Sequence, residues 1–396
     1  MSRFIKFSRF DRLIKFDCAL ARLTNLTNLT NLTHLSKLTR LTRLINLKKP
    51  MSSSQPFFID LFSLDRPFPG HGVRVSPPGA YDQAILRGGN VEERAWMGKR
   101  ILEHELRCLE EIGDDRVPML HCWSGTEVFA AAFGSPVSYP EHSMPFALPA
   151  VYTAEDADRL EEPDVFSGML GDMFRLADRM VELCGTQYPV RICDIQSPFD
   201  IAALIWEKEA FFNALIESPE AVHRLLRKVT NTLIGFIRAF RDRYANVCLV
   251  HYPDVWLPPE WGVCLSEDDI GSISNRHFEE FCLPYLQDLA SAFGGISMHS
   301  CAAGQHQWRS FLKLPRMRYL NLHHPPTSLQ VSIEMLSDRA VLIPATSFGV
   351  PYDLDFIREC LRLARPNTRF FFSLGAEDMQ KARELAGQIK RLCGRS

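Results

Sequence analysis

Residues 294–304 read GGISMHSCAAG and combine a strand pattern with two possible metal ligands. An apolar run between small residues predicts a short buried strand followed by a turn. Residues i and i+2 of a strand point to the same face, so His299 and Cys301 are expected to project together from the strand end. Imidazole nitrogen and thiolate sulfur are both good zinc ligands. An isolated His-x-Cys pair is also compatible with a purely structural role. The residues at the ends of the other strands therefore indicate whether the pair is functional.

Outward from this stretch, predicted strands alternate with predicted helices. The clearest helices are expected over residues 91–112, 166–184, 219–244, 275–293, 355–364 and 377–393. Strands are expected near residues 117–120, 189–193, 246–250, 295–299, 317–322, 340–343 and 368–372. Strands separated by helices predict a parallel sheet with right-handed crossovers, hence an α/β fold. Residues 263–265, or part of an irregular arm over residues 55–78, are candidates for an eighth strand that closes a (β/α)8 TIM barrel.

Polar side chains stand at the carboxyl ends of these strands, where the active site of a parallel α/β protein lies. They are His121, Asp194, His251, Asp254, His299, Cys301, His323 and Ser373. An open sheet would select the same residues, so the site prediction does not depend on barrel closure. Among them, Asp194, His251 and Asp254 are predicted catalytic residues. Asp268 and Asp269 precede a helix and are interpreted first as acids favoured by the helix dipole, with substrate contact as the alternative.

Composition narrows the class of protein. The chain has 396 residues, of which 46% are hydrophobic and 23% charged, as in ordinary globular proteins. No run of 18 apolar residues occurs, so no membrane span is predicted. The eleven cysteines are scattered singly without a CxxC pair, which favours reduced thiols in a cytoplasmic protein. Beyond residue 50 the chain is acidic, which argues against nucleic acid as a partner.

Residues 1–50 differ from the rest of the chain, because they are basic and contain the three-residue repeat LTNLTNLTNLTHL. A period of three fits neither a helix nor a strand over any length. The segment is interpreted as a disordered low-complexity tail, as a basic amphipathic or transit segment, or as sequence outside the mature protein. Met51, followed by three serines, resembles a natural first residue. It favours the interpretation as sequence outside the mature protein or as a disordered tail. Residues 51–396 are then expected to form the barrel.

Several stretches resemble the uroporphyrinogen decarboxylase superfamily, which includes cobalamin-dependent methyltransferases that act on a zinc-bound thiol. They are DIQSPFDIAALIWEKEAFFNALIESPEAVHRLL, GVCLSEDDIGSISNRHFEEFCLPYLQDLASAFGG, MHSCAAG and RFFFSLGAED. With shorter stretches near the start, they span roughly residues 85–395. The resemblance implies a (β/α)8 barrel, in agreement with the alternation of strands and helices.

The superfamily has two groups of members, which differ in their active-site residues. Decarboxylase members carry an RQAGRY motif near the first strand and a histidine near the last one, and this chain has neither. Methyltransferase members carry a His-x-Cys pair, matched by His299 and Cys301, and a later cysteine, where this chain has Ala376. His323, at the end of the next strand, is inferred from spacing as a replacement ligand. Two histidines and one cysteine form a sound zinc site with one open position.

The favoured function is therefore zinc-dependent methyl transfer between a corrinoid, or another methyl donor, and a small-molecule thiol. A corrinoid-carrying protein is the expected partner. One alternative is a divergent decarboxylase that acts on uroporphyrinogen or a related carboxylate. The other is a non-catalytic barrel that binds a corrinoid or tetrapyrrole, which the alanine in place of the later cysteine favours.

Overall fold

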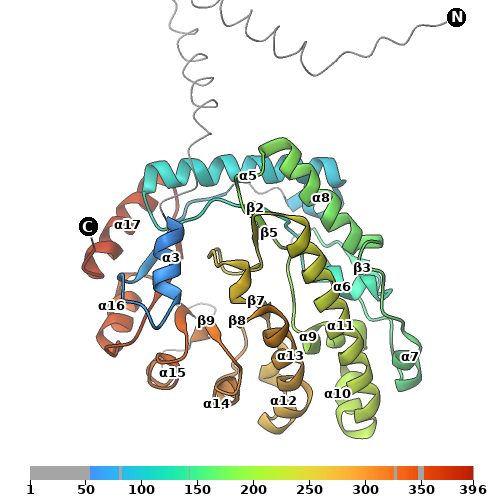
Figure 1. Cartoon of the computed structure of the whole chain (residues 1–396). Coiled ribbons are helices and arrows are strands. Elements are labelled where there is room, and N and C mark those ends of the chain that lie inside the picture. Colours follow the sequence, from blue (N-terminus) through green and yellow to red (C-terminus); the bar gives the residue numbers. More distant parts are fainter. Residues whose placement is uncertain (1–53, 80–82, 142, 325–327, 347–351, 396) are drawn as a thin grey trace, which may run out of the picture. The chain divides into compact units, whose positions relative to one another are not determined.

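The structure is a computed structural model that describes residues 54–79, 83–141, 143–324, 328–346 and 352–395 (Figure 1). The predictions made for residues 1–50 therefore lie outside the described residues. Within those ranges, no helix has both the length and the apolar character needed to cross a membrane.

Parallel strands form the centre of the described chain. They are β1 (Gly72–Ser76), β2 (Leu120–His121), β5 (Val190–Arg191), β6 (Val247–Cys248), β7 (Val263–Ser266), β8 (Ile296–Ser300), β9 (Met317–His324), β10 (Val341–Thr346) and β11 (Phe371–Gly375). They pair in the orders β10-β9-β8-β7, β2-β5-β6 and β1-β11. A separate antiparallel hairpin consists of β3 (Val137–Ser138) and β4 (Phe146–Ala147).

Backbone contacts join these three parallel groups. A parallel bridge between Leu342 and Phe370 connects β10 with β11, and a second one between Gln196 and Ser266 connects the chain after β5 with β7. Between β1 and the segment that enters β2, the N–H of Asp115 donates to the carbonyl of Val73 at 2.9 Å. The pairing thus runs in a closed ring through β1, β2, β5 and β7 to β11, which confirms the predicted (β/α)8 barrel.

Both candidates for the eighth strand are strands, namely β1 in the expected arm and β7 at residues 263–266. β6, which lies within the strand predicted over residues 246–250, pairs with β5. The N–H of Cys264 in β7 also donates to the carbonyl of Leu249, just after β6, at 3.1 Å. β6 therefore lies between β5 and β7, and hydrogen bonds join β6 and the residue after it to both of them.

Helices pack outside the strands (Figure 1). They are α3 (Ser54–Phe62), α4 (Gln83–Gly88), α5 (Val91–Ile112), α6 (Glu127–Ala132), α7 (Ala154–Arg159), α8 (Gly168–Cys184), α9 (Pro198–Ile205), α10 (Lys208–Glu217), α11 (Pro219–Arg243), α12 (Asn275–Phe281), α13 (Leu283–Phe293), α14 (Trp308–Phe311), α15 (Leu329–Leu336), α16 (Leu354–Leu363) and α17 (Met379–Leu392). The predicted bounds of α5 are exact because both ends are encoded locally. Asn90 and Glu93 form a capping box, and Gly113 ends the helix with φ of 68°.

The arm is the element for which the sequence prediction was wrong. Instead of an irregular segment, residues 55–78 contain all of α3 except its first residue, and all of β1. Phe58 and Phe62 of α3 are fully buried and pack on Phe371 of β11, with ring centroids 5.5 and 6.4 Å apart. The guanidinium of Arg369 donates to the carbonyls of Asp60 (2.6 Å) and two further residues at the end of α3. These partners satisfy carbonyls that a helix end leaves unpaired.

The strands divide their side chains between two apolar clusters. Phe370 and Phe372 of the β11 region belong to the large cluster under the helices, whereas Phe371 belongs to a second cluster with Tyr319 and Ile343. Such alternation is expected because successive strand residues face opposite sides. The second cluster therefore fills the barrel interior, and α3 packs against it. Polar groups that function in catalysis are left to the ends of the barrel.

Candidate functional site

The candidate site begins at the end of β8, where His299 and Cys301 face each other. Nε2 of His299 lies 3.1 Å from Sγ of Cys301, as expected for residues two positions apart on one strand face. His299 is buried, whereas Cys301 is exposed. The imidazole is thus held by the protein, and the sulfur is accessible to a molecule from solvent.

Asn321 of β9 fixes the ring of His299. The two residues are in register between β8 and β9, and Nδ1 of His299 lies 2.7 Å from Oδ1 of Asn321. The amide nitrogen of Asn321 donates to the carbonyl of Ile343 at 2.7 Å, so its oxygen must face the histidine. Nδ1 therefore carries the proton, and Nε2 keeps a lone pair directed at Cys301. Burial lowers the pKa of His299 despite the nearby Asp268 carboxylate, which favours the neutral ring.

Asp268 joins this pair from the turn after β7. Asp268, His299 and Cys301 each offer one possible ligand atom, and these atoms lie within 4.8 Å of one another. Oδ1 of Asp268 also accepts the backbone N–H of Cys301 at 2.6 Å. Asp268 is the N-cap residue of the 3-10 turn Asp269–Ser272, as expected for an acid at a helix start, but its side chain makes no capping hydrogen bond there. Its neighbour Asp269 instead pairs with Lys208, at 2.6 Å.

His323 reaches the same sulfur from the end of β9. Its Nε2 lies 3.7 Å from Sγ of Cys301, and its ring centroid lies 6.1 Å from that of His299. Burial lowers the pKa of His323. The structure therefore brings the three sequence-predicted ligands together, with the rings of His299 and His323 both close to the sulfur of Cys301.

Two predicted catalytic residues lie at adjoining strand ends. Nδ1 of His251, after β6, is 3.7 Å from Oδ1 of Asp194, after β5. Nε2 of His251 is 3.4 Å from the hydroxyl of Ser266, which is in register with His299. The Asp194–His251 pair is therefore adjacent to the His299–Cys301 pair.

The electrostatics of the Asp194–His251 pair suit proton transfer near neutral pH. Burial raises the pKa of Asp194 to about 7, although Gln196 donates a hydrogen bond of 2.5 Å that opposes the increase. Burial, followed by the charges of His299 and Arg191, holds the pKa of His251 well below its usual range. At neutral pH, Asp194 can thus hold or release a proton beside a neutral imidazole.

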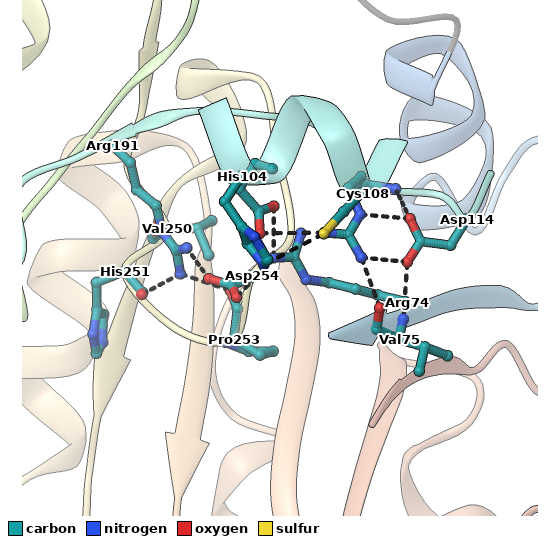
Figure 2. A network of polar contacts seen from close by, with 12 residues as sticks. Arg74, Val75, His104, Cys108, Asp114, Arg191, Val250, His251, Pro253 and Asp254 are labelled. Carbon is teal, nitrogen blue, oxygen red and sulfur yellow. Dashed lines mark hydrogen bonds and ion pairs between the residues drawn. The ribbon is translucent and has the colours of Figure 1, made fainter. Parts of the chain in front are cut away.

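The third predicted catalytic residue, Asp254, has a different environment. One carboxylate oxygen lies 3.0 Å from Nη2 of Arg74, and the other accepts a hydrogen bond from Nη1 of Arg191. Figure 2 shows both guanidinium groups in one network with this aspartate. Burial by itself raises the pKa of Asp254, but the two arginines outweigh it and hold the pKa far below its usual range. The carboxylate is therefore charged at neutral pH, which suits a positioning role better than proton transfer.

The same network extends away from the His299–Cys301 pair. Arg74 pairs with Glu105 at 2.8 Å, Glu105 with Arg116 at 3.2 Å, and Arg116 with Asp114 at 2.8 Å (Figure 2). A cavity of about 20 Å³ lies among Arg74, Glu105, His121, Arg191 and Asp254. This volume has room for about one water molecule. His121 is one of the residues that line this small cavity.

The end of β11 supplies no ligand of the kind that the resemblance implies. Ala376 follows this strand, and its N–H donates to the carbonyl of Ser76 at 2.9 Å. A methyl side chain cannot coordinate a metal. Sequence reasoning considered Asp268 for substrate contact but did not place it beside His299 and Cys301; it lies two residues after a different strand, β7. The signal was present, because β7 and β8 are parallel neighbours and Ser266 is paired with His299.

Comparisons with known proteins show the family of this chain. The uroporphyrinogen decarboxylase (URO-D) family matches the chain over residues 80–343. A curated uroporphyrinogen decarboxylase from Myxococcus xanthus (strain DK1622) is 29% identical over 171 residues, which are 41% of this chain and 44% of that protein. The match thus spans less than half of the relative's length.

A solved methyltransferase from Methanosarcina mazei has the same fold. It superimposes with a TM-score of 0.62 at 14% identity, and the superposition covers 85% of this chain and 98% of that one. At this identity the likeness concerns the fold alone. Because the family match covers well over half of the sequence, the chain belongs to the uroporphyrinogen decarboxylase family.

Proposed function

We propose that this protein transfers a methyl group between a corrinoid and a small thiol at a zinc centre with His299 and Cys301 as ligands. The observation that carries the proposal is the orientation of His299. Oδ1 of Asn321 accepts a hydrogen bond from Nδ1–H, and Nε2 is directed at an accessible sulfur 3.1 Å away. A histidine held by a hydrogen bond on its far nitrogen is the usual arrangement of a metal ligand.

The donor set fits zinc, which accepts nitrogen, sulfur and carboxylate oxygen ligands. Bound zinc lowers the pKa of a thiol that coordinates it, and so supplies a thiolate at neutral pH. His323, the third ligand predicted from sequence, lies 3.7 Å from the same sulfur. The exposure of Cys301 leaves an approach for a substrate from solvent.

The transfer step exchanges one bond for another. The sulfur of the substrate thiolate attacks the methyl carbon and forms the C–S bond. The carbon–cobalt bond breaks, and its electron pair stays on the corrinoid cobalt. We assign uptake of the thiol proton to Asp194, because its pKa of about 7 allows both protonation states at neutral pH. Gln196, which donates a hydrogen bond of 2.5 Å, orients this carboxyl group, and His251 lies 3.7 Å from it.

Decarboxylation is the second candidate, supported by the family match and by the name of the Myxococcus xanthus relative. A substrate with several carboxylates needs cationic groups to bind it. Arg74 and Arg191 of the barrel instead pair with the protein's own carboxylates, Glu105 and Asp254. This observation favours methyl transfer over decarboxylation.

The test is a side-by-side assay of the zinc-loaded full chain. One reaction contains methylcobalamin and mercaptoethanol, and the methyl thioether is measured by mass spectrometry. The other contains uroporphyrinogen, and released CO₂ is measured. We expect thioether from the parent protein and from Cys393→Ser, a half-buried cysteine on another part of the chain, but not from Cys301→Ser.

The other outcomes separate the alternatives. CO₂ release without thioether formation would contradict the proposal and select the decarboxylase. If neither product forms, while methylcobalamin binds in equilibrium dialysis, the protein is a binding barrel instead.

A further inference from the structure

The proposed centre lacks one protein ligand. Catalytic zinc sites hold three protein ligands and leave one position open for water or substrate. His299 and Cys301 supply two of the three. Ala376 cannot supply the third, so the donor must come from elsewhere in the barrel.

We infer that Asp268 is the third protein ligand, an inference that rests on the zinc-dependent function proposed above. Its possible ligand atom lies within 4.8 Å of those of both His299 and Cys301. Carboxylate oxygen binds zinc at distances close to those of histidine nitrogen. The ligands would then come from the neighbouring strands β7 and β8, without any residue of β11.

Backbone hydrogen bonds hold the two ligand-bearing turns together. The N–H of Cys301 donates to Oδ1 of Asp268 at 2.6 Å, and the N–H of Glu267 donates to the carbonyl of His299 at 2.9 Å. The buried carboxylate of Asp200 accepts the N–H groups of Asp268 (2.5 Å) and the residue after it (3.1 Å). The aspartate is thus positioned relative to the sulfur before any ion binds, which lowers the cost of assembling the site.

The charge of the site supports the same assignment. One thiolate and one carboxylate neutralise a divalent ion, as two thiolates would. Asp268 therefore replaces the charge, although not the sulfur, of the cysteine that Ala376 has displaced. Because carboxylate is a harder donor than thiolate, the site should also accept Co²⁺ readily. His323 then stands beside Cys301 without being required to retain the metal.

The experiment compares zinc affinity between two aspartates that are adjacent in sequence. Asp268→Asn keeps an oxygen that can accept the N–H of Cys301 but removes the anionic ligand. Asp269→Asn makes the same charge change at a residue that pairs with Lys208 instead. Zinc dissociation constants are measured on the full chain by competition with a chromophoric chelator.

We expect Asp268→Asn to weaken zinc binding by on the order of 100-fold or more, because even changes outside the ligand set cost about 10–100-fold. The zinc dissociation constants of Asp269→Asn and His323→Ala should stay within about threefold of the parent's, which is close to the deviation seen between sites that do not interact. Asp268→Cys, which restores a thiolate, should bind zinc and intensify the thiolate absorption of the Co²⁺ protein. Melting temperatures of all variants show whether each remains folded.

Each result bears on a different claim. A parent protein that binds no zinc would overturn the proposed function and this inference with it. A parent that binds zinc, with equal affinities for Asp268→Asn and Asp269→Asn, would overturn the inference alone. Loss of zinc from His323→Ala but not from Asp268→Asn would assign the third position to His323 instead. If Asp268→Asn fails to fold, failure of a folded Asp268→Cys to bind zinc would also overturn the inference.

Discussion

Two polar clusters lie in this barrel, and they differ in how their groups are paired. Around Asp254, three arginines pair with three carboxylates, and Figure 2 shows Arg74, Arg191 and Asp254 in this network. The guanidinium of Arg116 is fully buried. Around Cys301, two imidazoles and a carboxylate converge on one exposed sulfur. Each charge of the first cluster has an opposite charge, whereas the second gathers donors that suit a cation.

The difference separates positioning from chemistry. A carboxylate clamped by two arginines keeps one protonation state and holds the segments that carry it. Histidine, cysteine and aspartate side chains that lie together, as Asp268, His299 and Cys301 do, can accept an ion or a proton. Position at a strand end therefore did not distinguish Asp254 from Asp194, because that distinction depends on the neighbouring charges.

The largest effect is expected from Asp254→Asn, which removes the anion between Arg74 and Arg191. Leaving buried cations without their partner should lower the free energy of unfolding by about 3–5 kcal/mol at pH 7. Asp288→Asn, which breaks an exposed ion pair with Arg227, should cost less than about 1 kcal/mol. Urea unfolding followed by circular dichroism measures both.

The pH dependence of that effect has a defined sign. The folded-state pKa of Asp254 lies below its unfolded value of about 3.9. Its stabilisation is thus complete above about pH 4 and disappears as the pH falls through the folded pKa. A difference between parent and Asp254→Asn that stays below 1 kcal/mol at pH 7 would mean that the network is not held by this aspartate.

A smaller effect is expected from Asp194→Asn in the metal-free protein. Burial raises the folded pKa of Asp194 to about 7, so between about pH 4 and 7 the folded state binds more protons than the unfolded state. This carboxyl group therefore makes the parent less stable as the pH rises through that window. Relative to that of the parent, the free energy of unfolding of the variant should rise by about 2 kcal/mol from pH 4 to 7, after allowance for solvent screening. Above pH 7 the difference should not grow further.

Unfolding free energies at several pH values test this expectation. Parallel curves for the two proteins would show that Asp194 has an ordinary pKa. The carboxyl group could then not serve as the proton acceptor that we propose.

The smallest effect is expected from Asn321→Ala, which removes the partner of Nδ1 of His299. Loss of such a partner typically weakens metal binding by 10–100-fold, and about tenfold is expected here because the asparagine is uncharged. Asn321→Asp keeps an acceptor and should retain most of the affinity. Chelator competition measures both, and unchanged affinity in the alanine variant would remove Asn321 from the support of the site.

Local signals in the sequence were sufficient for some elements and not for others. The bounds of α5 follow from Asn90 and Gly113, which lie next to the helix. By contrast, α3 depends on Phe371 and Arg369, about 300 positions away in the chain, so nothing near it indicated a helix.

The site shows the same division. His299 and Cys301 are two positions apart, so strand geometry alone brings them together. Asp268 lies 33 positions before Cys301, and only the pairing of β7 with β8 makes them neighbours. The arginines around Asp254 come from β1 and β5, so the sequence near this aspartate did not reveal its ion pairs.

The central claim is that His299 and Cys301 hold zinc. The most direct measurement is the zinc content of the full chain, purified without chelators, by elemental mass spectrometry. We predict about one zinc per chain in the parent and in His277→Ala, a substitution on α12, and almost none in His299→Ala or Cys301→Ser. A parent without zinc, or a His299→Ala variant with the parent's content, would contradict the account.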